Sequence, residues 1–215
     1  MKKRYIIIIL AIGGFYSMLY FWHQEDLSVE QHPTINSPAA KPDDYLLEAK
    51  DYEDEQRHDK SANSIEQAIQ AIWKLETDVD DKSFERLEQT IQKLEAVHKR
   101  IIRDSIPSAE LLKAFEYALS NLARAELEVA QKYSTSDKLD ESRSALKYAQ
   151  LHIKNALMLH NSDRTEDSIQ QAIESQLVDE IDNLSNQEDL SQEQYLAALD
   201  KLMKEVDHVI AGVDE

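Results

Sequence analysis

Two Glu-x-x-His pairs are the residues of this chain whose types and spacing could do chemistry. They are Glu95 with His98 and Glu205 with His208. In helical bundles that hold two metal ions, a Glu-x-x-His pair from each of two helices joins a Glu from each of two others. The spacing therefore raises the hypothesis of a carboxylate-bridged dimetal site.

Frequency and helical phase both weaken the dimetal hypothesis. A chain of 215 residues with 22 Glu and 7 His contains such pairs by chance. At about 100° per residue, Glu95 points about 80° away from the apolar stripe of its helix, and His208 lies nearly opposite the stripe of its own. We therefore interpret His98 as a core or interface histidine, and keep the dimetal protein as a remote alternative. We expect no cofactor and no catalytic residue.

The scarcity of glycine and cysteine excludes most other chemistry. The chain has 3 Gly, at positions 13, 14 and 212, and no Cys. A phosphate-binding loop, a dinucleotide fingerprint and a Gly-x-Ser-x-Gly elbow all need glycines that the middle of the chain lacks. Disulfides, zinc sites with Cys ligands and thiol nucleophiles need cysteine. The sequence therefore predicts a protein that is not an enzyme.

The charge of the chain disfavours nucleic acid as a partner. The net charge is -18, but Lys2, Lys3 and Arg4 supply three of the 24 basic residues and all 42 acidic residues come later. The chain after Trp22 thus carries 21 basic and 42 acidic residues, a net charge of -21. Binding a polyanion needs clustered Lys and Arg, so we expect neutral or basic partners and no nucleic acid.

The N-terminal segment has the pattern of a membrane anchor. From Tyr5 to Trp22 about 18 residues carry no charge, enough for a helix of about 27 Å. A cleaved signal peptide would end in small residues, whereas this run ends in Met18 and bulky neighbours, with Tyr5 and Trp22 placed as interfacial aromatics. Residues 1–22 are therefore predicted to be a retained, single-pass signal anchor. The basic start then stays in the cytoplasm, so the rest is periplasmic or extracellular, outside the inner membrane of a bacterium.

Residues 23–60 are predicted to be an acidic tether. This stretch contains Pro33, Pro38 and Pro42 and shows no sustained apolar periodicity. Its one apolar cluster, at residues 45–47, predicts at most a short helix within 43–60.

Residues 61–215 are predicted to be helical throughout. Apolar residues recur at steps of three and four, and polar breaks or Pro107 separate the segments. Ser64 with Gln67, and Ser191 with Gln194, have the spacing of capping boxes. The predicted helices are about 64–79, 83–105, 107–133, 137–160, 165–184 and 191–211.

The fold class that follows is all-α: an N-terminal transmembrane helix, a flexible linker and an antiparallel bundle of about six helices. A short α-superhelical stack is the second choice, because helix pairs also build solenoids. The helix at 137–160 has apolar residues outside its main stripe, at Tyr148, Leu151 and Leu159. These need either a second neighbouring helix or an exposed contact, and we predict them as an interaction surface.

Contact with other proteins is the function that this pattern favours. We expect a membrane-anchored, acidic helical interaction or scaffold module of the bacterial envelope, whose partner is another envelope or membrane protein or a second copy of the chain. The stretch from Ser64 to Pro107, with AIQAIWKLE and FERLEQTIQKLEAV, resembles the N-terminal helix pair of exported YfdX-like stress-associated proteins, but the proline-marked later segments of that family are absent. That resemblance implies the alternative function, a chaperone-like envelope protein that binds unfolded or basic clients.

Overall fold

The computed structural model describes residues 38–75, 81–103, 106–136, 138–162, 168–187 and 189–214. Within these ranges the protein is all-α, an antiparallel packed bundle that begins at residue 38. Its elements, in chain order, are a short 3-10 helix and seven α-helices: η1 (Pro38–Ala40), α2 (Lys41–Asp54), α3 (His58–Leu75), α4 (Asp81–Arg103), α5 (Ser108–Thr135), α6 (Leu139–Ser162), α7 (Ser168–Asn186) and α8 (Gln192–Asp214).

The bundle starts earlier than the sequence pattern predicts. Residues 41–54, assigned to the tether, form α2, with Pro42 in the first turn followed by Asp43 and Asp44. Proline fits a first turn because its missing N–H has no partner there, and acidic side chains favour the positive end of the helix dipole. Leu46 and Ala49 of α2 are fully buried. The predicted short helix is therefore a packed element of the bundle.

One of the two predicted capping boxes forms. At the start of α8 the Ser191 amide donates to Gln194 Oε1 at 3.0 Å, and the Gln194 amide donates to Ser191 Oγ at 3.3 Å. Ser64, in contrast, lies inside α3, which begins at His58. Its hydroxyl donates to Glu48 of α2 at 3.0 Å, so Ser64 joins two helices rather than capping one.

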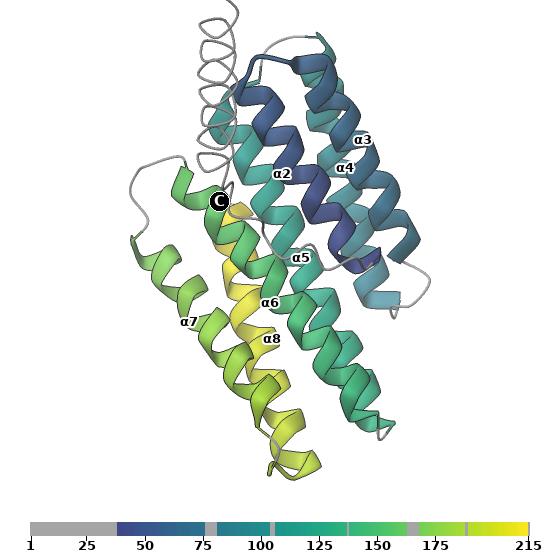
Figure 1. Ribbon diagram of the computed structural model, residues 1–215, viewed down its shortest axis with the longest axis vertical. Coiled ribbons are helices and arrows are strands. Elements are labelled where there is room, and N and C mark those ends of the chain that lie inside the picture. The colour runs from purple at the N-terminus through teal and green to yellow at the C-terminus, as the bar shows by residue number, and fades with distance from the viewer. Residues whose placement is uncertain are drawn as a thin grey trace, which may run out of the picture. The chain divides into compact units, whose positions relative to one another are not determined.

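Two apolar cores share the central helices α5 and α6. The first core takes its side chains from α2, α3, α4, one face of α5 as far as Ala125, and the end of α6. The second takes its side chains from another face of α5 from Tyr117 onward, from α6 as far as Ile153, and from α7 and α8. In Figure 1, α2, α3 and α4 lie in the upper part, α7 and α8 lie below them, and α5 and α6 run through both parts. The shared pair therefore forms the most extensive helix–helix interface among the described elements.

The predicted membrane anchor, with Tyr5 and Trp22, lies outside the described residues, as does the tether before residue 38. In the part of the chain that the structure does describe, no helix combines the length and the hydropathy needed to cross a bilayer.

Candidate functional site: an acidic groove beside a buried histidine

A groove of about 440 Å³ follows α5 and α6 where the helices of the first core end. Its walls are side chains one turn apart on the second half of α5 and the first half of α6. Pro38 and Ala39 of η1, with Leu75 and Leu87, close one end. The lining residues of the central pair are Leu122, Ala125, Glu126, Val129 and Tyr133 on α5, and Asp140, Glu141, Ser144, Ala145 and Tyr148 on α6.

The groove combines an apolar lining with a negative charge. Glu126, Asp140 and Glu141 contribute three carboxylates, and no Lys or Arg stands among its described lining residues. Tyr133 and Tyr148 are half-buried, and Lys138 Nζ lies over the Tyr133 ring, 5.7 Å from its centre. Such a surface favours a ligand that is apolar on one side and basic on the other.

A polar cluster is buried between α2 and α6. His152 Nδ1 and Asp43 Oδ1 are 2.6 Å apart, and Asn155 Nδ2 donates to Asp43 Oδ2 at 2.7 Å. Asp43 and His152 are fully buried, and Asn155 is 5% exposed. Both carboxylate oxygens of Asp43 are thus occupied, which is what a buried charge requires. His152 Nε2 has no hydrogen-bond partner among the described residues.

The surroundings of His152 favour its protonated form. Burial alone lowers the pKa of a histidine, but the charge of Asp43, its hydrogen bond and the more distant charge of Glu126 together outweigh that effect. The pKa of His152 is therefore raised above its ordinary value of 6.5.

The raised pKa predicts how stability depends on pH. A histidine whose pKa is raised by folding stabilises the folded state at pH values below its unfolded pKa, and this stabilisation is lost as the pH rises through the folded pKa. We expect the free energy of unfolding of the wild-type chain to exceed that of the variant His152→Gln most at pH below about 6.5, and the difference to shrink at higher pH. Denaturant titrations of both proteins over a pH series measure this difference. A difference that grew with pH would contradict the assignment.

The buried cluster adjoins the groove. Ala39, which lines the groove, lies one helical turn before Asp43, and Tyr148 lies one turn before His152 on α6. Glu126 belongs to both sites, since it lines the groove and acts electrostatically on His152. The cluster therefore fixes to α6 the segment that closes one end of the groove.

A second charge network, partly buried, joins α4, α5 and α8. Arg124 of α5 is 6% exposed, with its Nη1 2.5 Å from Glu128 Oε1 and its Nε donating to Asp207 Oδ1 at 3.1 Å. Arg86 of α4 reaches the same Asp207 oxygen at 3.0 Å. All these charges are paired, so the network connects the two cores and does not resemble a catalytic set.

The two Glu-x-x-His pairs lie apart from both sites. Glu95 is paired with Lys99 at 3.3 Å, and Glu205 with Lys201 at 3.3 Å. His98 is half-buried and His208 is exposed. Over the described ranges, no three His, Asp or Glu side chains are grouped so that they could hold a metal ion.

The three residues predicted as an interaction surface are separated by the fold. Tyr148 lines the groove, and Leu151 is half-buried outside it. Leu159 is 1% exposed and packs in the first core, so it is a core residue and not part of a surface. Leu159 lies off the main stripe of α6 because it packs against the first core. Of the two possibilities that the sequence pattern allowed, a second neighbour is the one that applies to this residue.

Asp43, His152 and Asn155 are not singled out by the sequence pattern, although a signal for His152 exists. Beside the main stripe of α6 runs a second one at steps of three and four, and all its members are buried: Ala145, Ala149, His152, Ala156 and Leu159. A histidine in an alanine-rich stripe indicates a buried polar group that needs a partner. The partner, Asp43, lies 109 residues away in the chain, and nothing in the local pattern identifies it.

Compared with known proteins, the chain matches no family model, no curated protein and no solved structure.

Proposed function

We propose that this chain is a helical interaction module whose groove between α5 and α6 binds an apolar, basic segment of a partner protein. The sequence-predicted anchor would hold the module at the outer face of a bacterial inner membrane, so the partner would be another envelope or membrane protein. The observation that carries the proposal is the groove, which combines an apolar lining with three carboxylates.

The dimensions of the groove suit a helix. Its lining residues extend from Leu122 to Tyr133 on α5, about 16 Å, and from Asp140 to Tyr148 on α6, about 12 Å. Two to three turns of an amphipathic helix, about ten residues, have that length. Laying the apolar face of a helix into an apolar groove is a common mode of peptide recognition.

The negative charge of the groove favours a partner segment with positive charge. Asp140 and Glu141 lie in the first turn of α6, next to the groove. Rim charges act mainly on the rate of association and on the choice of partner. A segment with Lys or Arg beside its apolar face is therefore favoured, and an acidic segment is repelled by a domain of this net charge.

Binding of a labelled amphipathic leucine–lysine helix of about 20 residues tests the proposal. We expect the full chain to bind it, and Tyr148→Ala to weaken binding about tenfold or more, because buried aromatics dominate such interfaces. Asp140→Lys with Glu141→Lys should weaken binding about tenfold and reduce its dependence on salt. Fluorescence anisotropy over a salt series measures both effects.

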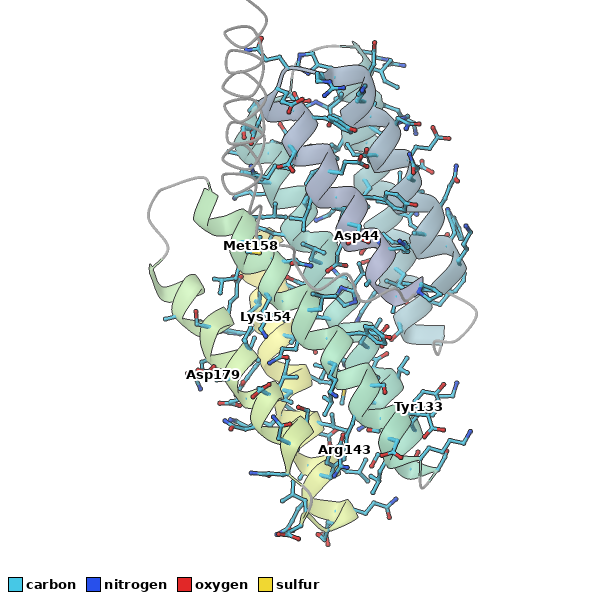
Figure 2. The ribbon with its side chains drawn as sticks, in the orientation of Figure 1. Asp44, Tyr133, Arg143, Lys154, Met158 and Asp179 are labelled. Carbon is cyan, nitrogen blue, oxygen red and sulfur yellow. The ribbon has the colours of Figure 1, made fainter. Side chains whose placement is uncertain are left out.

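Matched control variants outside the groove test whether the peptide binds in the groove. Leu151→Ala changes an apolar residue of the same helix outside the groove, and Asp179→Lys with Glu193→Lys makes the same charge change on α7 and α8. In Figure 2, Asp179 and Tyr133 lie on opposite sides of the lower part of the bundle. If the control variants weakened binding as much as the groove variants, or if a leucine–glutamate helix bound equally well, the proposal would be refuted.

The open, apolar groove also fits the alternative of a chaperone-like protein that holds basic clients. Such a protein would slow the aggregation of a basic, unfolded client at equimolar ratio, and Tyr148→Ala would reduce that protection. A chain that binds the leucine–lysine helix without slowing aggregation would instead be an interaction module.

A further inference from the structure

We propose that the Asp43–His152–Asn155 cluster is a proton-dependent latch that holds η1 and the start of α2 against α6 and thereby controls the groove. This inference rests on the proposed function for the role of the groove, but the latch itself can be tested without any partner.

The cluster is the main polar connection between α2 and α6. The start of α2 contributes Asp43, which accepts hydrogen bonds from two side chains one turn apart on α6. Taken as a whole, α2 packs chiefly on α3 and makes only small interfaces with α5 and α6. Weakening the cluster would therefore free the beginning of α2 while its later part stays attached.

Freeing the start of α2 would change the groove. Ala39 and Ala40 are buried, and Pro38 and Ala39 line the groove immediately before α2. The wall that these residues form is continuous with the turn that carries Asp43. Loss of the latch would displace that wall and remove apolar contacts from a bound segment.

The proton that controls the latch is the one on His152. Two charged groups act on it, Asp43 from α2 and Glu126 from α5. The neighbouring Asp44 is half-exposed, and its Oδ2 lies 3.7 Å from Lys41 Nζ. When His152 loses its proton, the Asp43 carboxylate faces two neutral donors instead of a cation and a neutral donor. Hydrogen bonds between two charged groups are stronger than those to a neutral donor, so the latch weakens as the pH rises.

The sign of the pH effect on affinity distinguishes the latch from a direct electrostatic effect of His152 on the bound segment. Loss of a positive charge near Glu126 makes the groove more negative, which by itself would tighten binding of a basic segment at high pH. A latch that opens makes binding weaker at high pH. The two explanations thus predict opposite signs for the same measurement.

Two measurements on the full chain between about pH 6 and about pH 9 test the latch. The first is hydrogen exchange of the amides in residues 38–49, corrected for the intrinsic effect of pH. We expect their protection to fall about fivefold or more as His152 loses its proton, while the amides of α8 are unaffected. The second is the affinity for the leucine–lysine helix, which should fall about fivefold or more over the same range.

His152→Gln and His208→Gln are the matched variants. His152→Gln should abolish the pH dependence of both measurements, whereas His208→Gln, an exposed histidine of α8, should preserve it. Unchanged protection of residues 38–49 across the pH range would overturn the latch whether or not the peptide binds. Changed protection with an affinity that stays constant or rises would overturn its control of the groove. A peptide that binds at no pH would refute the proposed function, and hydrogen exchange would still decide on the latch.

Discussion

Phe115→Ala is expected to lower the free energy of unfolding by about 3–5 kcal/mol, one of the two largest effects predicted for this protein. Phe115 lies in the first half of α5 and is fully buried in the first core. Removing the ring loses the free energy gained when a large apolar side chain moves from water into the core. It also leaves a cavity that the closely packed neighbouring helices cannot fill. For a domain of this size the midpoint of thermal unfolding should fall by roughly 10 °C, measured by circular dichroism on the full chain.

Phe84→Ala is the matched control for Phe115→Ala. Phe84 is the same residue type, placed on α4 with 39% of its surface exposed. We expect its replacement to cost about 1 kcal/mol or less, since surface substitutions seldom cost more. Equal losses for the two phenylalanines would mean that the first core is assigned incorrectly.

Arg124→Met is expected to cost about 3 kcal/mol or more, the second of the two largest effects. The guanidinium is buried and pairs with Glu128 and Asp207. Only 12% of the Glu128 side chain is exposed, and its Oε1 lies 2.5 Å from Arg124 Nη1, so removing the arginine takes a close cation away from a mostly buried carboxylate. Breaking a buried pair from one side costs about 3–5 kcal/mol, because the remaining charge has lost its compensation. Denaturant unfolding of the two chains measures the difference.

Two further variants separate the loss of charge pairing from the loss of packing. Arg86→Met removes the more exposed arginine that shares Asp207, and we expect a loss of about 1 kcal/mol or less. Arg124→Met with Glu128→Gln removes both partners and should regain part of the stability lost by the single variant. If the double variant were less stable by the full sum of the losses of Arg124→Met alone and Glu128→Gln alone, the pairing would contribute nothing.

The sequence predicts the fold class and most of the helices because apolar periodicity records which face of each helix is buried. It does not record how far a neighbouring helix extends. Phe84 lies three residues before Leu87 and seven before Ile91, the spacing of one apolar helical stripe, yet it is exposed while they are buried. It lies in the first turn of α4, where the stripe continues in the sequence whether or not a neighbour covers it.

The beginning of the bundle is the part of the fold that the sequence pattern misplaces. Pro42 resembles the other tether prolines when read for composition, but Pro42, Asp43 and Asp44 together form the first turn of a helix. An isolated α2 has little apolar surface, and the burial of its side chains depends chiefly on α3. Its stability thus comes from tertiary contacts that local propensity does not contain.

The candidate site is predicted only in part. Tyr148 is found from the sequence because an apolar residue off the main stripe needs a contact. Asp140 and Glu141 look like an ordinary acidic first turn, and only the fold places them beside Tyr148. The Asp43–His152 pair joins residues that are 109 positions apart in the chain, and local sequence pattern does not contain a contact of that separation.

The sharing of α5 and α6 by both cores sets an order in which the chain can fold. Most extensive interfaces join helices that follow one another in the sequence, namely α2 with α3, α3 with α4, α4 with α5, α5 with α6 and α6 with α7, whereas α5 with α8 is the principal exception. Local contacts of this kind favour rapid folding. The first core can be completed as soon as α6 has been synthesised. The second core needs α8 as well, so the apolar side chains of α5 that α8 covers stay exposed until α8, the last helix of the described residues, has been made.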